Sequence, residues 1–334
     1  MNILIIGGTR NVGHMLALTL LEAGHAVTVF NRGRTRDDLP AAVTRVRGDR
    51  NAPDGLEPAL ALADHDAVVD MVLYDGAQAR RSIAQLAGRT GHYVFISTGQ
   101  VYLVREGLQR PFHEDDYDLG SAMPEPTPGS FDHEEWLYGV EKREAEDLLA
   151  RAWQERALPV STLRLPMVNS ARDHFLRLYS YLLRLRDGGP VLVPDAPQYP
   201  LRHVYAADVV QAILALLARG PGRGEVFNIS QDETVSLADW LALLAEVAGL
   251  RPAPLVKVPR AELEGAGLLP GCSPFSETWM SELDNARSVA ELGMRYTPLA
   301  ACLADIVRQV ERQAPPAPPS YARRGDELAL ARQQ

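Results

Sequence analysis

A tyrosine and a lysine stand four residues apart in the segment Tyr138-Gly139-Val140-Glu141-Lys142. Residues with this spacing lie one turn apart on the same helix face, so a helix here brings phenol and ammonium together. A phenol with a pKa of about 10 exchanges protons poorly at neutral pH, whereas a neighbouring ammonium favours the phenolate and lowers that pKa. The spacing therefore predicts a general acid/base, with an ordinary surface pair as the alternative.

Hydroxyl groups follow a predicted strand, His92–Ile96, in the segment Ser97-Thr98-Gly99-Gln100-Val101-Tyr102. Ligands of open α/β sheets bind beyond the carboxyl ends of the strands, so Ser97, Thr98 and Gln100 are well placed to meet one. Standing alone, this segment would be interpreted as a Ser/Thr turn. The tyrosine–lysine pair and a glycine-rich turn near the start of the chain favour a site instead.

That turn follows Asn2–Ile6, an unbroken apolar run of strand length, and precedes a helical pattern of apolar residues. Backbone N–H groups at a helix N-terminus favour anions, and glycine lets the backbone approach a pyrophosphate closely. We therefore predict a dinucleotide site, with a tight turn that binds nothing as the alternative. The residues assigned to it are Gly7, Gly8, Thr9, Arg10, Asn11, Val12 and Gly13.

The end of the second predicted strand, Ala26–Phe30, bears on which coenzyme binds. In a dinucleotide fold, a carboxylate there binds the ribose 2′-hydroxyl and an arginine accepts a 2′-phosphate. Asn31 and Arg32 stand where the acid is expected, and Arg10 lies in the glycine turn. These residues favour NADP over NAD, although arginines in loops are also found simply solvated.

Apolar runs and helical patterns alternate along the first 165 residues, as in a right-handed, doubly wound parallel sheet. Asp49 and Arg50 follow the third strand, where a carboxylate can accept a hydrogen bond from adenine. Leu73 follows the fourth strand and would lie along the cofactor. The further strands are predicted at Val43–Val46, Ala67–Val72 and Val160–Leu165, and the helices at Gln78–Ala87 and from Tyr138 to about Glu155.

Composition limits the classes of protein to which the chain can belong. The 334 residues are 46% hydrophobic and 23% charged, which is typical of a globular protein. A net charge of −9 argues against nucleic acid or an anionic membrane as partner. Two cysteines, Cys272 and Cys302, form no metal or redox motif. With a strand beginning at Asn2 and no long apolar run, we expect a cytoplasmic protein.

The segment Leu103–Leu137 carries nine acidic residues and two arginines, and it is rich in proline and glycine. A loop of this length is usually functional or mobile, and we interpret it as a flexible flap beside the site. Two of its clusters, His113-Glu114-Asp115-Asp116 and His133-Glu134-Glu135, contain metal-ligating residue types. Neither has a helical i,i+4 pairing or an evident third ligand, so we interpret both as solvated charge and predict no metal site.

Together these motifs resemble the extended short-chain dehydrogenase/reductase family. The resemblance reaches about Gln313, through Leu163-Arg164-Leu165-Pro166, Arg202-His203-Val204-Tyr205-Ala206-Ala207-Asp208-Val209, Phe227-Asn228-Ile229 and the closing Asp284 to Pro298 stretch. It implies a Rossmann-like α/β fold with a smaller, discontinuous α/β substrate domain. It also implies that Thr98 holds the reacting oxygen, that Tyr138 is the acid/base and that Lys142 holds the nicotinamide ribose. Ser97, Leu165 and Pro166 would line the cofactor.

Two departures from the family pattern narrow the reaction. Arg10 replaces a middle glycine, which resembles a divergent branch that includes plastid RNA-binding relatives. Gly99-Gln100 stands where sugar-nucleotide dehydratases have an acidic pair and where decarboxylases keep a glutamate, so both reactions are disfavoured. Epimerisation and simple carbonyl/alcohol redox on a sugar-like substrate remain, as does a non-catalytic RNA-binding or cofactor-sensing protein on the same fold.

The second half is expected to supply the substrate domain. We predict a dinucleotide domain of residues 1–165 and 201–231, a substrate domain of 166–200 and 232–312, and a loose Pro-rich tail of 313–334. A helix at Ala171–Asp187 carries four arginines, and Arg202 lies one residue from where the family places a diphosphate-binding arginine. Because one residue reverses the face of a strand, a sugar-nucleotide substrate stays open. The resemblance also implies a homodimer formed through Gln78–Ala87 and Val140–Ala152.

Overall fold

The computed structural model describes residues 1–35, 37–195 and 198–334. The chain divides into two compact units, each assembled from three segments. Unit 1 comprises Met1–Pro166, Ala206–Ser230 and Leu283–Arg295, and unit 2 comprises Met167–Tyr205, Gln231–Glu282 and Tyr296–Gln334. The stretch Leu283–Arg295, which we had assigned to the substrate domain, therefore belongs to unit 1.

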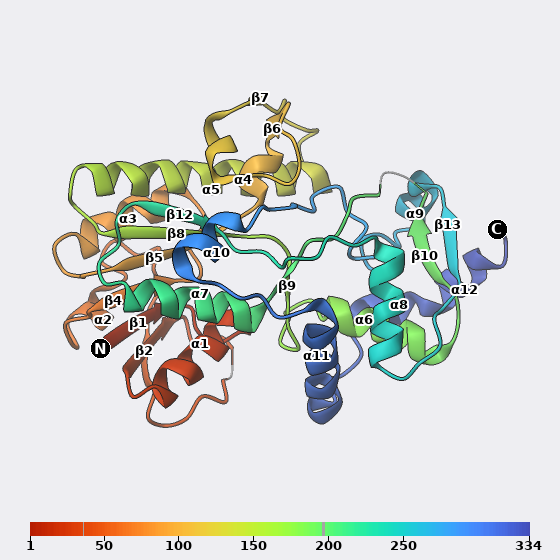
Figure 1. Ribbon diagram of the computed structural model, residues 1–334, viewed down its shortest axis with the longest axis horizontal. Helices are drawn as coiled ribbons and strands as arrows, with labels where there is room; N and C mark the ends of the chain where they lie inside the picture. Colours follow the sequence, from red (N-terminus) through yellow and green to blue (C-terminus); the bar gives the residue numbers. More distant parts are fainter. Residues whose placement is uncertain (36, 196–197) are drawn as a thin grey trace. The chain divides into compact units, whose positions relative to one another are not determined.

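Unit 1 is built on a parallel sheet that contains seven strands within the described residues (Figure 1). The strand order is β12-β8-β5-β4-β1-β2-β3, and every neighbouring pair is parallel. The bounds are β1 (Asn2–Ile6), β2 (Ala26–Asn31), β3 (Thr44–Arg47), β4 (Ala67–Asp70), β5 (Tyr93–Thr98), β8 (Val160–Leu165) and β12 (Glu225–Asn228). The order reverses at β1, which confirms the predicted doubly wound α/β fold.

Helices cover both faces of this sheet (Figure 1). On one face α3 (Gly76–Leu86) packs against α5 (Phe131–Gln154), and on the other α1 (Asn11–Glu22) packs against α7 (Ala206–Ala218). The central strands are apolar on both sides, and the residues of β1 from Ile3 to Ile6 are almost fully buried. Burial on both faces is what the unbroken apolar runs predicted. The short helices α2 (Glu57–Leu60), α4 (Gln100–Leu103) and α10 (Ala286–Leu292) complete unit 1.

The acidic segment Leu103–Leu137 has more structure than the flexible flap we expected. It contains a hairpin of β6 (Arg105–Glu106) and β7 (Ser121–Ala122), and a 3-10 turn, η1 (Glu114–Asp118). Glu114 accepts a hydrogen bond from the Asn228 backbone of β12 at 2.7 Å, which ties the turn to the sheet. The helix α5, which carries Tyr138 and Lys142, begins at Phe131, not Tyr138, because the Ser130 side chain caps it by accepting from the His133 N–H.

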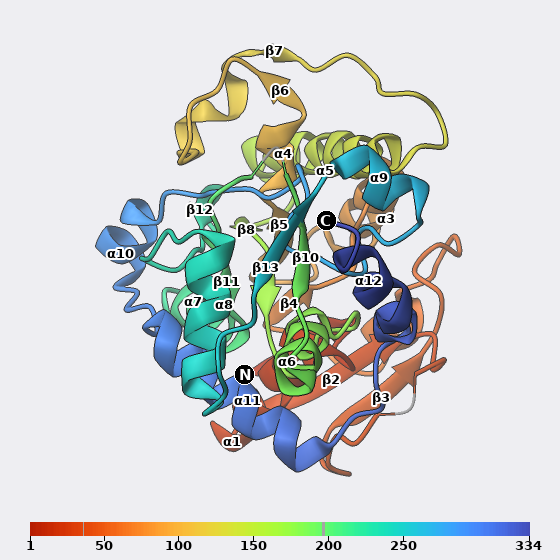
Figure 2. The same cartoon turned by 90° about the vertical axis from the view of Figure 1, so that its right-hand side faces the viewer.

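Unit 2 contains two small parallel pairs and several helices. Figure 2 shows β10 (Val191–Pro194) beside β13 (Leu255–Val258), and β9 (Val168–Asn169) pairs with β11 (Val204–Tyr205). The helices are α6 (Arg177–Asp187), α8 (Leu237–Val247), α9 (Arg260–Gly265), α11 (Leu299–Gln313) and α12 (Arg324–Ala331), with a 3-10 turn η2 (Pro319–Arg323). The helix expected from Ala171 begins six residues later because Asp173 accepts hydrogen bonds from the backbone N–H groups of Phe175 and Arg177.

The C-terminal segment is not the loose tail that its prolines indicated. Glu327 in α12 is almost fully buried and receives the Arg184 guanidinium of α6 at 2.9 Å. Arg324 pairs with the same carboxylate at 2.9 Å and with Asp187 at 2.7 Å. This network of two arginines and two acids fixes α12 within unit 2.

Candidate functional site

The glycine turn links β1 to α1 and has the conformation of an anion site. Gly7 and Gly8 have φ angles of +106° and +77°, which favour glycine. A Cβ on Gly13 would lie 2.7 Å from the Gly8 Cα, so strand and helix approach too closely for any side chain. Thr9 and Arg10 lead into the helix, and the Arg10 side chain bonds to Thr35 at 2.8 Å instead of capping it. The first-turn N–H groups of α1 therefore face the turn.

A buried oxygen in this turn supports the fit of a dinucleotide. Asn11 has a φ angle of +44°, and its Oδ1 atom is buried with no hydrogen-bond partner among the described residues. Val12 beside it is buried and anchors the helix start. A buried acceptor of this kind is costly unless a ligand or water supplies the donor. The N–H groups of the turn and of the helix N-terminus fit the diphosphate part of a nicotinamide nucleotide, whereas the Asn11 oxygen needs a donor such as a ribose hydroxyl or a water.

The adenosine end of the expected site shows one clear difference from prediction. Arg50 is buried and donates to Asp70 at 2.7 Å and to Ser82 at 2.8 Å, so it stabilises the core below the sheet edge instead of facing a cofactor. Asp49 is exposed and accepts from the Asn51 N–H at 3.0 Å. Sequence reasoning could not detect that a basic residue at a strand end has a partner twenty residues away.

Asn31 and Arg32 lie where β2 ends. The Asn31 side chain accepts from the Gly33 N–H at 2.7 Å, and its Nδ2 atom is buried without a partner among the described residues. Arg32 is exposed. Burial raises the pKa of the Tyr74 phenol, and the positive charges of Arg50, Arg10 and Arg32 partly offset that rise.

The predicted reacting groups meet at the carboxyl edge of the sheet. Thr98 is the last residue of β5, and its hydroxyl lies close enough to the Tyr138 phenol on α5 to favour the ionised phenol. The Tyr138 ring lies 6.4 Å from the Tyr74 ring and is half-buried. Burial raises the pKa of Tyr138 above its ordinary value, and the Tyr74 and Glu135 charges act in the same direction. The expectation of a lowered phenol pKa is therefore wrong for the protein without ligand.

Lys142 lies one turn further along α5 and is 3% exposed. Its ammonium donates to the Leu73 carbonyl at 2.8 Å and to the Ile96 carbonyl at 2.7 Å, at the ends of β4 and β5. Burial lowers the pKa of Lys142 to about 7. The two carbonyls hold the amine at the sheet edge. Leu73 therefore binds Lys142 through its backbone carbonyl, while its side chain is buried in the core.

The lowered pKa of Lys142 predicts a pH dependence of stability. Above about pH 7 the folded amine is neutral, whereas the unfolded chain keeps the proton up to about pH 10.4. Unfolding then takes up a proton, so the free energy of unfolding rises with pH across this window. In urea titrations, we expect the unfolding free energy of the wild type to rise from pH 7 to pH 9 relative to that of Lys142→Met, which has no amine to titrate. A difference that stays flat contradicts the assignment.

Ser97 differs from its predicted role as a cofactor contact. Its hydroxyl donates to Glu146, whose carboxylate also receives the Arg164 guanidinium of β8. All three side chains are buried. Arg164 continues the network by donating to the Tyr102 hydroxyl at 2.6 Å. Ser97 therefore belongs to a buried polar network that joins β5, α5 and β8 below the site.

Of the remaining predicted residues, Leu165, Pro166 and Gln100 lie in unit 1, whereas Arg202 lies in unit 2. Leu165 and Pro166 end β8 and are buried, and the Leu165 carbonyl accepts from the Gly99 N–H at 2.7 Å. The Gln100 backbone N–H donates to the Thr98 hydroxyl at 3.2 Å, which brings Gln100 to the reacting groups. Arg202 lies in unit 2, where it donates to the Gln231 carbonyl at 2.9 Å.

Glu135 is a site residue that sequence reasoning missed. We assigned it to the solvated charge of the acidic segment, but it lies on α5 and accepts a hydrogen bond from the Gln100 amide. The signal that could have found it is its spacing, because it precedes Tyr138 by three residues and so shares a helix face with it.

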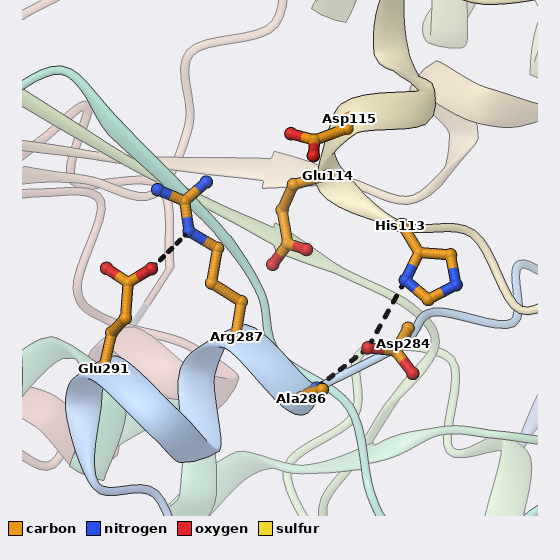
Figure 3. Close-up of a pocket in the computed structure, with 7 residues that line it drawn as sticks. All are labelled: His113, Glu114, Asp115, Asp284, Ala286, Arg287 and Glu291. Atoms are coloured by element: carbon orange, nitrogen blue, oxygen red, sulfur yellow. Dashed lines mark hydrogen bonds and ion pairs between the residues drawn. The ribbon is translucent and has the colours of Figure 1, made fainter.

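A separate pocket of unit 1 lies away from these groups (Figure 3). His113 faces Asp284 at 3.6 Å, and Arg287 pairs with Glu291 at 2.9 Å. The lining is almost wholly charged and internally paired, which is unlike the apolar lining of most small-molecule sites. The residues drawn are His113, Glu114, Asp115, Asp284, Ala286, Arg287 and Glu291.

Among the described residues, the helices are all too short or too polar to cross a membrane. Two characterised relatives have similar sequences. The chloroplast stem-loop binding protein of 41 kDa b of Arabidopsis thaliana is 27% identical over 267 residues, which are 75% of this chain and 64% of that protein. The chain thus spans less than two thirds of that relative's length. The 2'-dehydrokanamycin reductase of Streptomyces kanamyceticus is 25% identical over 287 residues, 84% of this chain and 76% of the reductase.

Solved structures show the same fold. UDP-glucose 4-epimerase of Thermotoga maritima, determined with UDP-glucose, aligns with a TM-score of 0.72 at 21% identity, covering 94% of this chain and all of that one. MoeE5 in complex with UDP-glucose and NAD aligns with a TM-score of 0.70 at 20% identity over the same shares. The model of the NAD dependent epimerase/dehydratase family matches residues 3–230. With the glycine turn and the Tyr138 site in place, the chain belongs to this family of NAD-dependent enzymes of the short-chain dehydrogenase/reductase type.

Proposed function

We propose that the protein is an NAD(P)-dependent oxidoreductase, or an epimerase, that acts on an alcohol or carbonyl of a sugar-like molecule. The observation that carries the proposal is that the Tyr138 phenol on α5 lies near the Thr98 hydroxyl, which ends β5 at the carboxyl edge of the sheet. Lys142 lies one turn along the same helix. Family membership and the similarity to a named reductase support this function.

In the proposed reduction, the bound nicotinamide supplies hydride to the carbonyl carbon. The Thr98 hydroxyl holds the carbonyl oxygen against Tyr138, and the phenol gives its proton to that oxygen as the C–O double bond becomes single. The raised pKa keeps the phenol protonated and ready to donate. In the oxidation direction the same groups accept the proton, and an epimerase would turn the keto sugar over before hydride returns. Lys142 would hold the nicotinamide ribose beside the two strand ends.

Two substrate classes fit this chemistry. UDP-sugars are present in structures of neighbours with this fold, and Arg202 is the residue we propose for a diphosphate. The relative named as 2'-dehydrokanamycin reductase supports a sugar without a nucleotide. The nine acids of the segment Leu103–Leu137 would repel a diphosphate, which favours the second class.

We propose NADP as the preferred coenzyme, with NAD as the alternative. Arg10 follows β1 and Arg32 follows β2, so both stand beyond the carboxyl ends of neighbouring strands, where they would pair with a 2′-phosphate. We expect Arg32→Ala to raise the Kd for NADPH about tenfold, equivalent to about 1.4 kcal/mol, and to leave the Kd for NADH nearly unchanged. Arg34→Ala, a second exposed arginine of the same loop, is the control. Equal losses for both coenzymes would argue against 2′-phosphate recognition. Fluorescence titration of each reduced coenzyme measures these constants.

The activity is tested by following nicotinamide absorbance at neutral pH with NADPH or NADH. Keto sugars with and without a nucleotide are offered, 2'-dehydrokanamycin among them, and UDP-glucose with NAD tests epimerisation. Oxidation of the coenzyme by a keto sugar supports the reductase, and interconversion of sugars without net oxidation supports the epimerase. Binding of coenzyme without turnover of any sugar would instead indicate a cofactor sensor.

Similarity to a chloroplast stem-loop binding protein makes RNA binding the second candidate function. The net charge of −9 argues against it, because phosphate-driven binding needs clustered positive charge. Filter binding of a stem-loop RNA at low and physiological salt distinguishes the two.

On the family resemblance, we further propose that the protein is cytoplasmic and that it forms a homodimer through α3 and α5. Light scattering of the protein as it elutes from a sizing column would measure the mass of the particle and so test the dimer.

A further inference from the structure

Glu135 extends the line of polar groups that leads away from Tyr138. It precedes Tyr138 by three residues on α5, so the two side chains project from the same helix face. Its carboxylate accepts from the Gln100 amide, and the Gln100 backbone donates to the Thr98 hydroxyl at 3.2 Å. Two hydrogen bonds, one from the Gln100 side chain and one from its backbone, therefore connect the Glu135 carboxylate to the Thr98 hydroxyl. The Thr98 hydroxyl lies near the Tyr138 phenol and favours its ionised form.

Glu135 and Tyr138 lie one helical turn apart on α5, which brings the two side chains near each other. The negative charge of Glu135 raises the pKa of the phenol. Glu135 and Tyr138 are both half-buried, so one side of each is open to solvent. The Gln100 amide orients the carboxylate, and the part of Glu135 that faces solvent can be reached by a bound molecule.

We infer that Glu135 recognises a positively charged amino group on the substrate, close to the carbon that is oxidised or reduced. The inference rests on the proposed function and specifies its substrate class as an amino sugar. An ammonium beside the reacting carbon would donate to the carboxylate while the neighbouring carbonyl oxygen lies between Thr98 and Tyr138. A hydroxyl could donate as well, but only a cation gains the charge-assisted bond. The acidity of Leu103–Leu137 would also steer a cation to the site.

The pairing gives Gln100 a role that the family resemblance does not supply. A glutamate at that position would place two carboxylates against each other, and one of them would be driven to take a proton. The neutral amide instead donates to Glu135 and keeps its charge fixed beside the site. Glu135 is a specificity residue in this account, and it takes no part in moving the hydride or the proton.

Binding of matched sugars tests this assignment without depending on turnover. The probes are methyl 2-amino-2-deoxyglucoside, its N-acetyl derivative and methyl glucoside, titrated by saturation-transfer NMR in the presence of NADP⁺. We expect the wild type to bind the free amine at least about tenfold more tightly than the two neutral sugars, the equivalent of about 1.4 kcal/mol. In Glu135→Gln that preference should disappear, because the neutral amide attracts the cation no more than the hydroxyl.

Glu134→Gln provides the matched control, since Glu134 is the exposed neighbour on the same helix. It removes the same charge and should keep the preference. Gln100→Met is a second route, which leaves the carboxylate but removes the amide that orients it, and should weaken the preference without abolishing it. NADPH binding and thermal unfolding of each variant report whether it is folded.

The outcomes separate this inference from the proposed function. Equal binding of charged and neutral sugars by the wild type, no binding of the amine, or a preference that survives Glu135→Gln overturns the assignment of Glu135. If Glu134→Gln removed the preference for the amine as fully as Glu135→Gln, the preference would come from the overall negative charge of this surface and not from Glu135. Amine-selective binding with no coenzyme turnover of any sugar would leave Glu135 as the recognition group and reject the catalytic proposal.

Discussion

Tyr138→Phe is expected to lower kcat by about 10³-fold while NADPH still binds with nearly unchanged affinity. The substitution removes one oxygen from the group that meets the Thr98 hydroxyl and leaves the ring in place. Positioned proton transfer contributes about 10² to 10⁴-fold to enzymatic rates, and hydride transfer to a carbonyl needs that proton as the oxygen gains charge. Steady-state kinetics on whichever sugar the coenzyme assay identifies, together with coenzyme titration, measure both quantities.

Tyr74→Phe is the informative comparison for this prediction. The Tyr74 ring lies 6.4 Å from Tyr138, and burial raises the pKa of both phenols. The Thr98 hydroxyl favours the ionised form of the Tyr138 phenol and shows no such effect on the Tyr74 phenol, so only the loss of Tyr138 should remove the proton donor. If Tyr74→Phe lost the greater part of kcat and Tyr138→Phe did not, the roles of the two phenols would have to be exchanged.

The pKa of Tyr138 is raised and that of Lys142 is lowered, so a bound coenzyme would have to change the ionisation of both groups to favour their charged forms. Without ligand, burial raises the phenol pKa and lowers the amine pKa to about 7, so both groups favour their neutral forms. The neutral phenol suits proton donation during reduction. Oxidation of an alcohol needs the phenolate, and a positively charged nicotinamide would favour it.

The central sheet could be predicted because local sequence determines it. Most of the buried strands are short apolar runs, and β1 and β8 begin and end at the predicted residues. The start of α5 was placed seven residues late because its first turns are acidic and aromatic, and the Ser130 cap was overlooked. In that case the local signal was present and was not used.

Roles that depend on distant partners could not be predicted in the same way. Arg50 has the sequence position of a cofactor contact, but Asp70 and Ser82 come from other elements and bury it. Ser97 likewise donates its hydroxyl to Glu146 instead of facing a cofactor. Glu135 joins the site only because the Gln100 amide donates to its carboxylate. Charged and hydroxyl side chains near a sheet edge can serve the ligand or the core, and only three-dimensional proximity decides between them.

The C-terminal helix supplies the second large effect, on stability. Glu327 is 1% exposed and is the carboxylate shared by Arg184 and Arg324, and Arg184 is itself fully buried. Removing one partner of a buried ion pair leaves an uncompensated charge and typically costs about 3–5 kcal/mol. We expect Glu327→Ala to reduce the free energy of unfolding of unit 2 by about this amount, measured by urea titration with the fluorescence of buried Trp240 as the probe.

Asp326→Ala is the matched control, one residue earlier on the same helix. Its carboxylate is 59% exposed and pairs with Arg323, which is 48% exposed. Exposed pairs contribute about 0–1 kcal/mol, so this variant should unfold at nearly the wild-type urea concentration. The contrast follows from burial alone, because both substitutions remove an acid that an arginine contacts. If both variants lost little stability, α12 would be a dispensable tail, as its proline-rich approach first indicated. A large loss confined to Glu327→Ala would show that the last turns of the chain hold unit 2 together.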